Sequence, residues 1–326
     1  MNNSQPWQKY PLIRKPLEEV NQLIQATIRT PYSDLQDALL EMASNGGKYL
    51  RPSLLILSAQ IASKKETVSK QIIQLASSIE ILHMASLIHD DIIDDSDERR
   101  GKISIQARFG KDTAVYAGDL LFTHFFDLIL NAISEQDYMI KNAHTMHHLL
   151  AGELGQMAER FNLSQDFNDY LTNVKGKTAA LFRLAAEEGS HFGNGDEQTT
   201  QALASFGENL GIAFQIVDDI LDYTGGKQLT LEDLTTGVYS LPILLALSKK
   251  ELREQLVPLL EKKRQMSKND IEQIQKILLN SSVIEETHAL AEQYTNRALA
   301  NLAQLPQTNA TVLLKKMTRK LVNRTL

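Results

Sequence analysis

Apolar residues recur at spacings of three and four along most of this chain, and that pattern constrains its fold more than any other feature. One stripe of small and apolar side chains repeats in this way between Gln71 and Asp94, and another runs from Leu203 to Tyr223. Such spacing places the side chains on one face of a helix. The 326 residues contain 16 glycines and 8 prolines, so long helices can run without interruption.

Similar patterns cover much of the rest of the chain, whereas the alternation of apolar and polar residues that is typical of strands is hard to find. The other expected helical segments are 19–44, 48–63, 113–134, 136–160, 166–190, 240–248, 250–262, 269–279, 283–303 and 309–323. Segments rich in glycine, asparagine or proline separate them, and none has the composition of a linker between domains. We therefore expect one all-α domain over residues 1–326.

Composition narrows the classes of function. The net charge of −6 and the pI near 5.8 argue against a nucleic-acid partner. The absence of cysteine excludes disulfides and thiolate metal sites and agrees with a cytoplasmic location. The first residues lack the apolar core of a signal peptide, and no stretch approaches the about 18 uninterrupted apolar residues that a membrane span needs. We expect a soluble protein without a membrane span.

An acidic motif occurs twice. "HDDIID" at residues 89–94 returns as "VDDILD" at residues 217–222, and each ends an apolar helical stretch. The first and last aspartates of each motif lie one turn apart on the same helix face. Like charges at this spacing, near the negative end of a helix dipole, destabilise a helix by some tenths of a kcal/mol. The aspartates are Asp90, Asp91, Asp94, Asp218, Asp219 and Asp222.

A divalent cation removes this electrostatic conflict. Magnesium prefers oxygen ligands and is usually held by one or two carboxylates together with phosphate oxygens. Two such clusters facing one another could therefore grip a diphosphate through bridging metals. The alternative is that both clusters are ordinary solvated helix ends, but the repetition of the motif argues against it. A calcium loop of the EF-hand type is excluded, because its glycine and its distal glutamate are absent.

Basic residues accompany these clusters and suggest a second anion site. Each one alone could be an ordinary surface charge, but loops that combine glycine with basic side chains are natural anion sites. The segments are "GGKYLRP" with Lys48 and Arg51, "ERRGK" with Arg99 and Arg100, and "KGKTAALF" with Lys177 and Thr178.

Taken together and in order, these motifs resemble the trans-isoprenyl diphosphate synthases, or polyprenyl synthetases. The resemblance is to medium- and long-chain members, such as the catalytic subunits of heptaprenyl diphosphate synthases. The segments "DDIIDDSDERRG", "FQIVDDILDY", "GGKYLRP" and "GKTAALF" carry it, and residues 109–122 and 152–156 match further family segments. It spans roughly residues 40–325 and implies a bundle of long antiparallel helices around a central cavity, usually in a homodimer.

The resemblance also implies roles for individual residues. It makes isopentenyl diphosphate and an allylic diphosphate the substrates and Mg²⁺ the cofactor, with about three ions per site once diphosphate is bound. The implied metal ligands are the six aspartates above, of which Asp90, Asp91, Asp94 and Asp218 are expected to be catalytic together with Lys177. The implied ligands of the allylic diphosphate are Arg99, Lys177, Thr178 and Gln215. Those of isopentenyl diphosphate are Lys48, Arg51, His83 and Arg100, although His83 on its apolar helix could instead be a core histidine.

The implied chemistry fits these residue types. Cations draw negative charge away from the allylic diphosphate, so that its C–O bond ionises to a carbocation. The double bond of isopentenyl diphosphate attacks this cation, and a proton then leaves. Because no protein base stands out, we expect the departing diphosphate to accept that proton.

The chain departs from the family pattern at two places. Tyr49 follows "GGK" where the family usually has a basic residue. The segment "TGGKQLTLEDLTTG" after the second aspartate motif is shorter than the family's Gly-Lys-Pro-x-Gly-x-Asp segment and lacks its proline. Lys227 could replace the family's lysine here, but the register is ambiguous.

Small residues close to the first motif suggest a long product. Ser86 and Ala85 lie four and five residues before Asp90, where short-chain members tend to carry aromatic residues. A floor could come from a neighbouring helix through Phe122, Phe125 and Phe126. We expect a product of roughly C30–C50, for a quinone side chain, and a product of about C15–C20 is the alternative.

Other interpretations remain open at this point. Some relatives with these motifs are active only with a small partner protein. A terpene cyclase would share the fold and the first motif, but it normally lacks the second motif. A zinc protein could use His144 and His148, which lie one helical turn apart, yet no further ligand has clear spacing. A non-catalytic subunit would tolerate loss of the aspartates, and both sets are intact.

Overall fold

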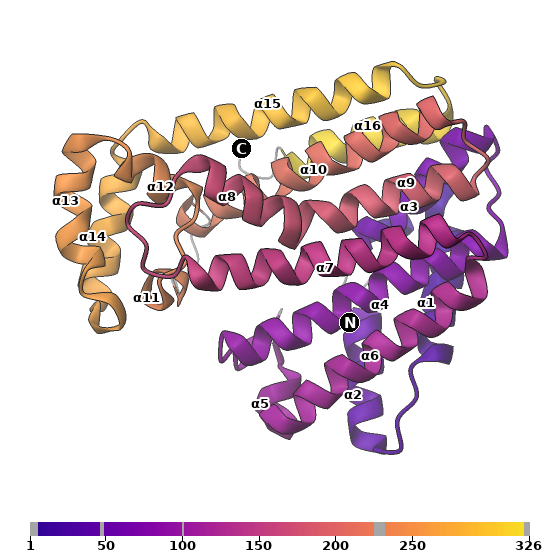
Figure 1. Ribbon diagram of the computed structural model, residues 1–326, viewed down its shortest axis with the longest axis horizontal. Coiled ribbons are helices and arrows are strands. Elements are labelled where there is room, and N and C mark those ends of the chain that lie inside the picture. The colour runs from indigo at the N-terminus through magenta and orange to yellow at the C-terminus, as the bar shows by residue number, and fades with distance from the viewer. Residues whose placement is uncertain (1–5, 46–48, 100, 225–231, 323–326) are drawn as a thin grey trace. The chain divides into compact units, whose positions relative to one another are not determined.

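The computed structural model in Figure 1 describes residues 6–45, 49–99, 101–224 and 232–322. Helices make up nearly all of these ranges. The strands within them are the two-residue β1 (Glu98–Arg99) and β2 (Lys102–Ile103), which pair antiparallel. The prediction of an all-α fold is confirmed.

Most helices begin and end close to the expected positions. Those of the first half are α1 (Pro11–Thr27), α2 (Ser33–Asn45), α3 (Leu50–Ser63), α4 (Lys70–Ile93), α5 (Ile105–Phe109), α6 (Lys111–Ala132) and α7 (Gln136–Ala158). Those of the second half are α8 (Phe167–Val174), α9 (Ala180–Phe192), α10 (Glu197–Thr224), α11 (Glu232–Thr236), α12 (Leu241–Leu247), α13 (Lys250–Leu260), α14 (Lys268–Leu279), α15 (Val283–Ala303) and α16 (Asn309–Val322). The shorter turns are the 3₁₀ turns Pro6–Lys9 and Lys263–Gln265 and the π-helical turn Lys175–Ala179.

The expectation of one helix over 19–44 is wrong. The chain forms α1, then leaves the helical conformation, and begins α2 at Ser33. Pro31 lies in this gap. Proline cannot donate a helical hydrogen bond and disfavours the helical conformation of the residue before it, so it separates the two helices.

By its internal contacts the chain forms two compact units, each built from several segments. Unit 1 consists of Met1–Asn142, Ala185–Leu203 and Leu305–Val312. Unit 2 consists of Ala143–Leu184, Ala204–Gln304 and Leu313–Leu326. A single domain over residues 1–326 remains a prediction, and the two units are described separately.

Helix α4 forms the core of unit 1. The Ser69 side chain caps its first turn by accepting a hydrogen bond from the Ile72 amide at 3.3 Å. The apolar stripe seen in the sequence is buried, and α4 packs against α1, α3 and α6. The three-four spacing of the sequence therefore predicted this core helix correctly.

Two helices of unit 1, α4 and α6, are long and apolar enough to cross a membrane by length and composition alone. The relevant window of α4 is 72% buried within the protein, as expected for a core helix, but that of α6 is only 39% buried. Core helices of soluble proteins pass the same test, so this is weak evidence for a membrane span. It does show that α6 has an apolar face that the chain itself leaves exposed.

Unit 2 has its own hydrophobic core. Buried side chains of α10, α12, α14 and α15 pack together, among them Ile216, Leu244, Leu278 and Ala291. Helix α14 begins with a capping box, in which the Ser267 and Asp270 side chains each accept a hydrogen bond from the other residue's backbone amide. The capping box fixes where α14 begins.

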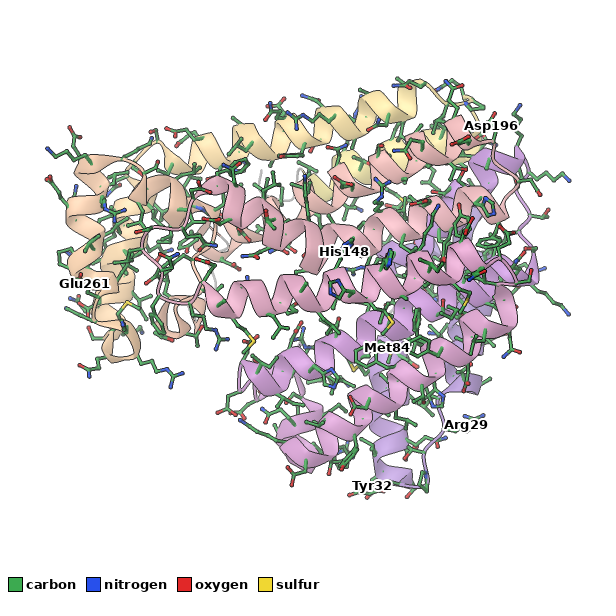
Figure 2. All side chains as sticks on the ribbon, viewed as in Figure 1. Arg29, Tyr32, Met84, His148, Asp196 and Glu261 are labelled. Carbon is green, nitrogen blue, oxygen red and sulfur yellow. The ribbon has the colours of Figure 1, made fainter. Side chains whose placement is uncertain are left out.

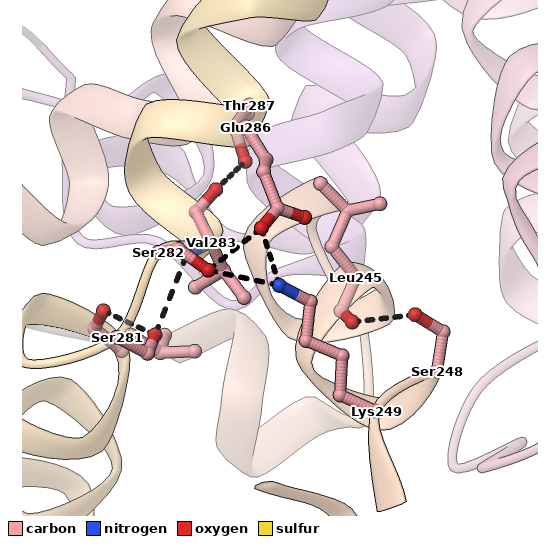
Figure 3. A network of polar contacts seen from close by, with 9 residues as sticks. Leu245, Ser248, Lys249, Ser281, Ser282, Val283, Glu286 and Thr287 are labelled. Atoms are coloured by element: carbon pink, nitrogen blue, oxygen red, sulfur yellow. Dashed lines mark hydrogen bonds and ion pairs between the residues drawn. The ribbon is translucent and has the colours of Figure 1, made fainter.

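A polar network joins the start of α13 to the start of α15 in unit 2, as Figure 3 shows. The Lys249 ammonium contacts Glu286, and it donates a hydrogen bond to Ser282 Oγ at 3.0 Å. Ser282 Oγ in turn donates to Glu286 Oε1 at 2.7 Å. The hydrogen bond from Lys249 is the main cause that lowers the pKa of Glu286. A carboxylate in the first turn of α15 also suits the positive end of its helix dipole.

Candidate functional site

The first aspartate cluster (Asp90, Asp91 and Asp94) closes α4 in unit 1. Asp94 is the C-cap residue, and its amide donates to the Asp90 carbonyl at 2.9 Å. The three side chains differ in exposure: Asp91 is buried, Asp90 is partly buried and Asp94 is exposed. Since the outer two lie one turn apart, they share the more accessible face of the helix end.

Asp91 is held by a predicted substrate ligand. Its Oδ1 accepts hydrogen bonds from Arg99 Nε at 2.7 Å and contacts Arg99 Nη2 at 2.6 Å. Burial raises the pKa of Asp91 above its ordinary value, while the Arg99 guanidinium offsets part of that effect. The short β1–β2 hairpin carries Arg99 back toward the end of α4, so the sequence order Asp-Asp-x-x-Asp…Arg-Arg-Gly brings these two residues together.

A histidine beside the first cluster was not predicted to have a role. His89 Nε2 lies 3.3 Å from Asp119 Oδ1 on α6, and its ring packs against Phe122 with centroids 5.3 Å apart. A Cβ at Gly118 would lie 2.4 Å from His89 Nε2, so a larger residue at this position would displace the His89 ring. The family segment at 109–122, which contains both Gly118 and Asp119, was the available signal.

The second aspartate cluster (Asp218, Asp219 and Asp222) lies near the end of α10 in unit 2 and repeats the exposure pattern of the first. Asp219 is buried, Asp218 is partly buried and Asp222 is exposed. Asp219 Oδ1 accepts a hydrogen bond from Gln215 Nε2 at 2.9 Å, and Oδ2 accepts one from the Leu241 amide at 3.0 Å. The middle aspartate of each motif is thus buried and accepts hydrogen bonds from protein groups.

Two predicted ligands of the allylic diphosphate meet at this second cluster. Thr178 Oγ1 donates a hydrogen bond to Gln215 Oε1 at 2.8 Å, and Gln215 Nε2 donates one to Asp219 Oδ1. Thr178 belongs to the π-helical turn between α8 and α9. Single π-helical turns occur often at functional sites. The structure therefore joins Thr178, Gln215 and Asp219 in one hydrogen-bonded chain.

The neighbouring Lys177 reaches in another direction, to α7. Its Nζ lies 2.9 Å from Glu153 Oε2 and donates to Gln156 Oε1 at 3.0 Å. The segment "GELGQ" at 152–156 matches the family pattern, but the sequence alone predicts no role for Glu153 or Gln156. The acidic and amide residues three positions apart on one helix face were the signal that could have identified them.

The predicted ligands of isopentenyl diphosphate are described only in part. Lys48 and Arg100 lie outside the described residues, as does Lys227 in the segment after α10. Arg51 in the first turn of α3 and His83 on α4 are both partly buried in unit 1.

Tyr49, the first departure from the family pattern, is a core residue here. It is buried, its hydroxyl accepts from Asn21 Nδ2 at 2.8 Å, and it donates to the Ala43 carbonyl at 3.0 Å. A basic side chain would have to bury its charge at this position, which is costly.

The two sides of the segment after α10 are tied together. The Tyr223 and Ser240 hydroxyls lie 2.8 Å apart, and the Leu241 amide binds Asp219 as described above. Residues 225–231 are outside the described part of the chain. Contacts on both flanks nonetheless hold the start of α12 close to the second aspartate cluster.

The residues of the predicted chain-length wall lie on α4. Ala85 is fully buried, and Ser86 is partly buried with its hydroxyl donating to the His83 carbonyl at 2.9 Å. Helix α6 packs extensively against α4 and carries Phe122, Phe125 and Phe126. Phe122 packs against His89 of α4, Phe125 is buried and Phe126 is exposed, so a floor built from all three aromatic residues remains a prediction.

No group of three or more acidic or histidine side chains in the described part of the chain is arranged to hold a metal by itself. His144 and His148, the two histidines considered for zinc, are therefore not part of such a group among the described residues; His148 is labelled in Figure 2. Magnesium needs no such group when one or two carboxylates and substrate oxygens complete its shell. The exposed and partly buried aspartates of each cluster fit that mode of binding.

Comparisons with known proteins agree with these motifs. The sequence pattern of the polyprenyl synthetase family matches residues 33–278. The heptaprenyl diphosphate synthase component 2 of Bacillus subtilis is 30% identical over 305 residues, which cover 92% of this chain and 86% of the relative. A crystal structure of geranylgeranyl pyrophosphate synthase from Lactobacillus brevis has a TM-score of 0.92, with 35% identity over 98% of this chain and 99% of that one. The heptaprenyl diphosphate synthase from Staphylococcus aureus has a TM-score of 0.90, with 31% identity over 96% of this chain and 99% of that one.

Proposed function

The chain belongs to the polyprenyl synthetase family, and on that premise we propose that it condenses isopentenyl diphosphate with an allylic diphosphate to form a trans-polyprenyl diphosphate. One observation carries the proposal beyond family membership. Both Asp-Asp-x-x-Asp motifs lie at the end of a helix, with the middle aspartate buried and hydrogen-bonded and the outer two more exposed to solvent. A helix end selected only for stability has no need of this arrangement twice.

The residues present fit Mg²⁺ as the cofactor. Asp90, Asp94, Asp218 and Asp222 would supply carboxylate oxygens, while Asp91 and Asp219 would hold the motifs in place through their protein partners. When bound, the metal ions would neutralise charge on the diphosphate leaving group. About three ions per site remain the expectation from the family resemblance.

The protein's own groups would bind and orient the substrates. As the family resemblance implies, Lys177, Thr178, Gln215 and Arg99 would each bind the allylic diphosphate, and Arg51 and His83 would contribute to isopentenyl diphosphate binding together with Lys48 and Arg100. As the allylic C–O bond breaks, its electron pair passes to the diphosphate, whose added charge these donors stabilise. The isopentenyl double bond then forms the new C–C bond, and the proton that leaves goes to the released diphosphate.

We propose a product of medium to long chain, roughly C30–C50. The small side chains of Ala85 and Ser86 on α4 support it, and two similar proteins are named heptaprenyl diphosphate synthases. The Lactobacillus brevis neighbour is named for a shorter, geranylgeranyl product. The α4 residues favour the longer product, because side chains at these positions would act directly on the length of chain that fits.

A second candidate is a synthase that works only with a partner component. The name of the Bacillus subtilis relative, "component 2", favours it. We also propose that a second copy of this chain covers the exposed face of α6, in accord with the homodimers of the family. A cytoplasmic location remains a prediction.

The test is an elongation assay with purified protein, Mg²⁺, labelled isopentenyl diphosphate and allylic primers from C5 to C20. We expect one dominant long product and no product in the presence of EDTA. Replacing Ala85 with phenylalanine should shorten the product, because the larger ring narrows the space beside α4, whereas Ala38→Phe on α2 is a matched control that should leave the length unchanged. A wild-type product of only C15 or C20 contradicts the proposed chain length. No elongation without a co-purified partner favours the second candidate.

A further inference from the structure

The strongest unassigned feature is the contact between the π-helical turn and α7 in unit 2. A Cβ at Gly152 would lie 2.5 Å from the Lys177 amide nitrogen, and a Cβ at Gly176 would lie 2.5 Å from the His148 carbonyl oxygen. Both glycines therefore allow the two backbones to touch. These backbone contacts hold the backbone of Lys177 close to α7, independently of any side-chain contact.

Two side chains of α7 then contact the Lys177 ammonium. Glu153 Oε2 is 2.9 Å from Nζ, and Gln156 Oε1 accepts a hydrogen bond from it at 3.0 Å. The Glu153 and Lys177 side chains are only 18% and 30% exposed, so the pair is less screened than one on an open surface. Lysine has a long flexible stem with rotatable donors, and it needs such partners to hold one position.

The next residue along the turn faces a different set of partners. Thr178 binds Gln215, which binds Asp219 of the second aspartate cluster. The turn thus connects α7 on one side to the aspartate cluster of α10 on the other. A shift of the Lys177 ammonium would therefore change its position relative to Thr178, Gln215 and Asp219, which hydrogen bonds hold together.

We propose that Glu153 is a positioning residue for the reaction: it holds the Lys177 ammonium in the place where charge develops on the leaving diphosphate. The inference rests on the proposed function of Lys177 as a ligand of the allylic diphosphate. A misplaced lysine loses more interaction with the transition state than with the ground state, because the leaving group gains charge as the bond breaks. Loss of Glu153 should therefore lower kcat more than it raises KM.

The main test moves the carboxylate from one α7 residue that contacts Lys177 to another. Glu153→Gln keeps the size of the side chain but removes its charge, and we expect kcat to fall by about tenfold or more with a less than about threefold change in either KM. Adding Gln156→Glu to that variant places a carboxylate at the other contact, and it should restore a large part of kcat. An unchanged kcat in Glu153→Gln, or no recovery in the exchanged variant, overturns the proposal.

Coupling to Lys177 separates positioning from a general effect. If Glu153 acts through Lys177, then Glu153→Gln should have no further effect on kcat in a Lys177→Ala background. Additive losses would mean that Glu153 acts by another route. Glu208→Gln is the matched control, since it removes an ion pair with Arg183 at 3.1 Å in the same unit and should leave kcat unchanged.

A readout without turnover keeps this inference distinct from the proposed function. Brief acetylation followed by mass spectrometry measures how accessible the Lys177 amine is to reagent. We expect labelling of Lys177 to increase about threefold or more in Glu153→Gln, with an unfolding midpoint within a few degrees of wild type because a partly exposed ion pair contributes little stability. If wild type proves inactive both alone and with a co-purified partner, the proposed function fails, and equal labelling of both proteins would separately refute the positioning of Lys177.

Discussion

At the scale of single residues, the most unusual group outside the candidate site is Glu188 on α9. It is fully buried in unit 1, and Asn142 Nδ2 donates to its Oε1 at 2.6 Å. Burial raises the pKa of Glu188 to about 8. Glu188 Oε2 and Asn142 Oδ1 are both buried without a hydrogen-bond partner in the described part of the chain. A proton on the carboxyl group would turn Oε2 into a donor and relieve this deficit of donors.

This burial predicts a pH dependence of stability. In the unfolded chain a glutamate has a pKa near 4.3, so between there and about pH 8 the folded state binds more protons than the unfolded state. The contribution of Glu188 to the free energy of unfolding is therefore fully present below the pKa of the unfolded chain, and it is lost as pH rises to about 8. The loss is on the order of a few kcal/mol, since each pKa unit corresponds to about 1.4 kcal/mol.

Urea unfolding of wild type and Glu188→Gln between pH 5.5 and 8.5 checks this prediction. The amide cannot ionise, so the free energy of unfolding of the variant should fall less with pH than that of wild type. The nearby Glu187 carboxylate raises the pKa of Glu188 and the Lys141 ammonium lowers it, and both stay in the variant. Parallel pH profiles of the two proteins would show that Glu188 does not titrate in this range.

At the scale of elements, the contact between α7 and the π-helical turn makes two similar glycine substitutions behave differently. In Gly176→Ala the new methyl group would meet the His148 carbonyl at 2.5 Å, and backbone cannot easily move away. In Gly155→Ala it would meet the Asn173 side-chain oxygen at 2.6 Å, and a side chain can rotate. Alanine is otherwise better than glycine in a helix by about 1 kcal/mol.

We therefore expect Gly176→Ala to lower the free energy of unfolding by about 1–3 kcal/mol and to reduce elongation activity, because Lys177 follows directly. Gly155→Ala should change stability by less than about 1 kcal/mol in either direction. Thermal unfolding and the elongation assay measure both effects. Equal behaviour of the two variants would mean that the backbone contact at Gly176 is less restrictive than its geometry indicates.

At the scale of the whole molecule, the sequence predicted the all-α class and most helix positions because three-four periodicity depends only on local spacing. It failed at residues 28–32, where Pro31 breaks an apolar pattern that continues on both sides. It also gave no sign of the π-helical turn, since "KGKTA" differs from a regular helix only in its hydrogen bonding. Contacts between residues distant in sequence were the hardest to predict. The ion pair between Lys177 and Glu153 depends on how the π-helical turn packs against α7. The family match at 152–156 indicated the segment but not this contact.

Helix α6 raises a last question at this scale, namely what covers its apolar side. Val115, Tyr116, Phe126 and Leu130 are exposed, and at about 100° per residue they fall within one arc of roughly 100° on the helix. Aromatic and large aliphatic side chains on one exposed face are typical of protein interfaces. These exposed side chains also explain why the most apolar stretch of α6 is only 39% buried.

If a second copy covers this face, Leu130→Glu should convert a dimer into a monomer, because a carboxylate buried without a partner costs several kcal/mol. Leu130 is 63% exposed in the single chain, so the substitution should leave the fold of the subunit intact. Leu279→Glu on α14, where the leucine is 45% exposed, is the matched control and should remain dimeric. Light scattering after size exclusion measures the mass. A monomeric wild type that binds lipid vesicles through α6 would instead assign this face to a membrane surface, and a dimer that survives Leu130→Glu would place the subunit contact elsewhere.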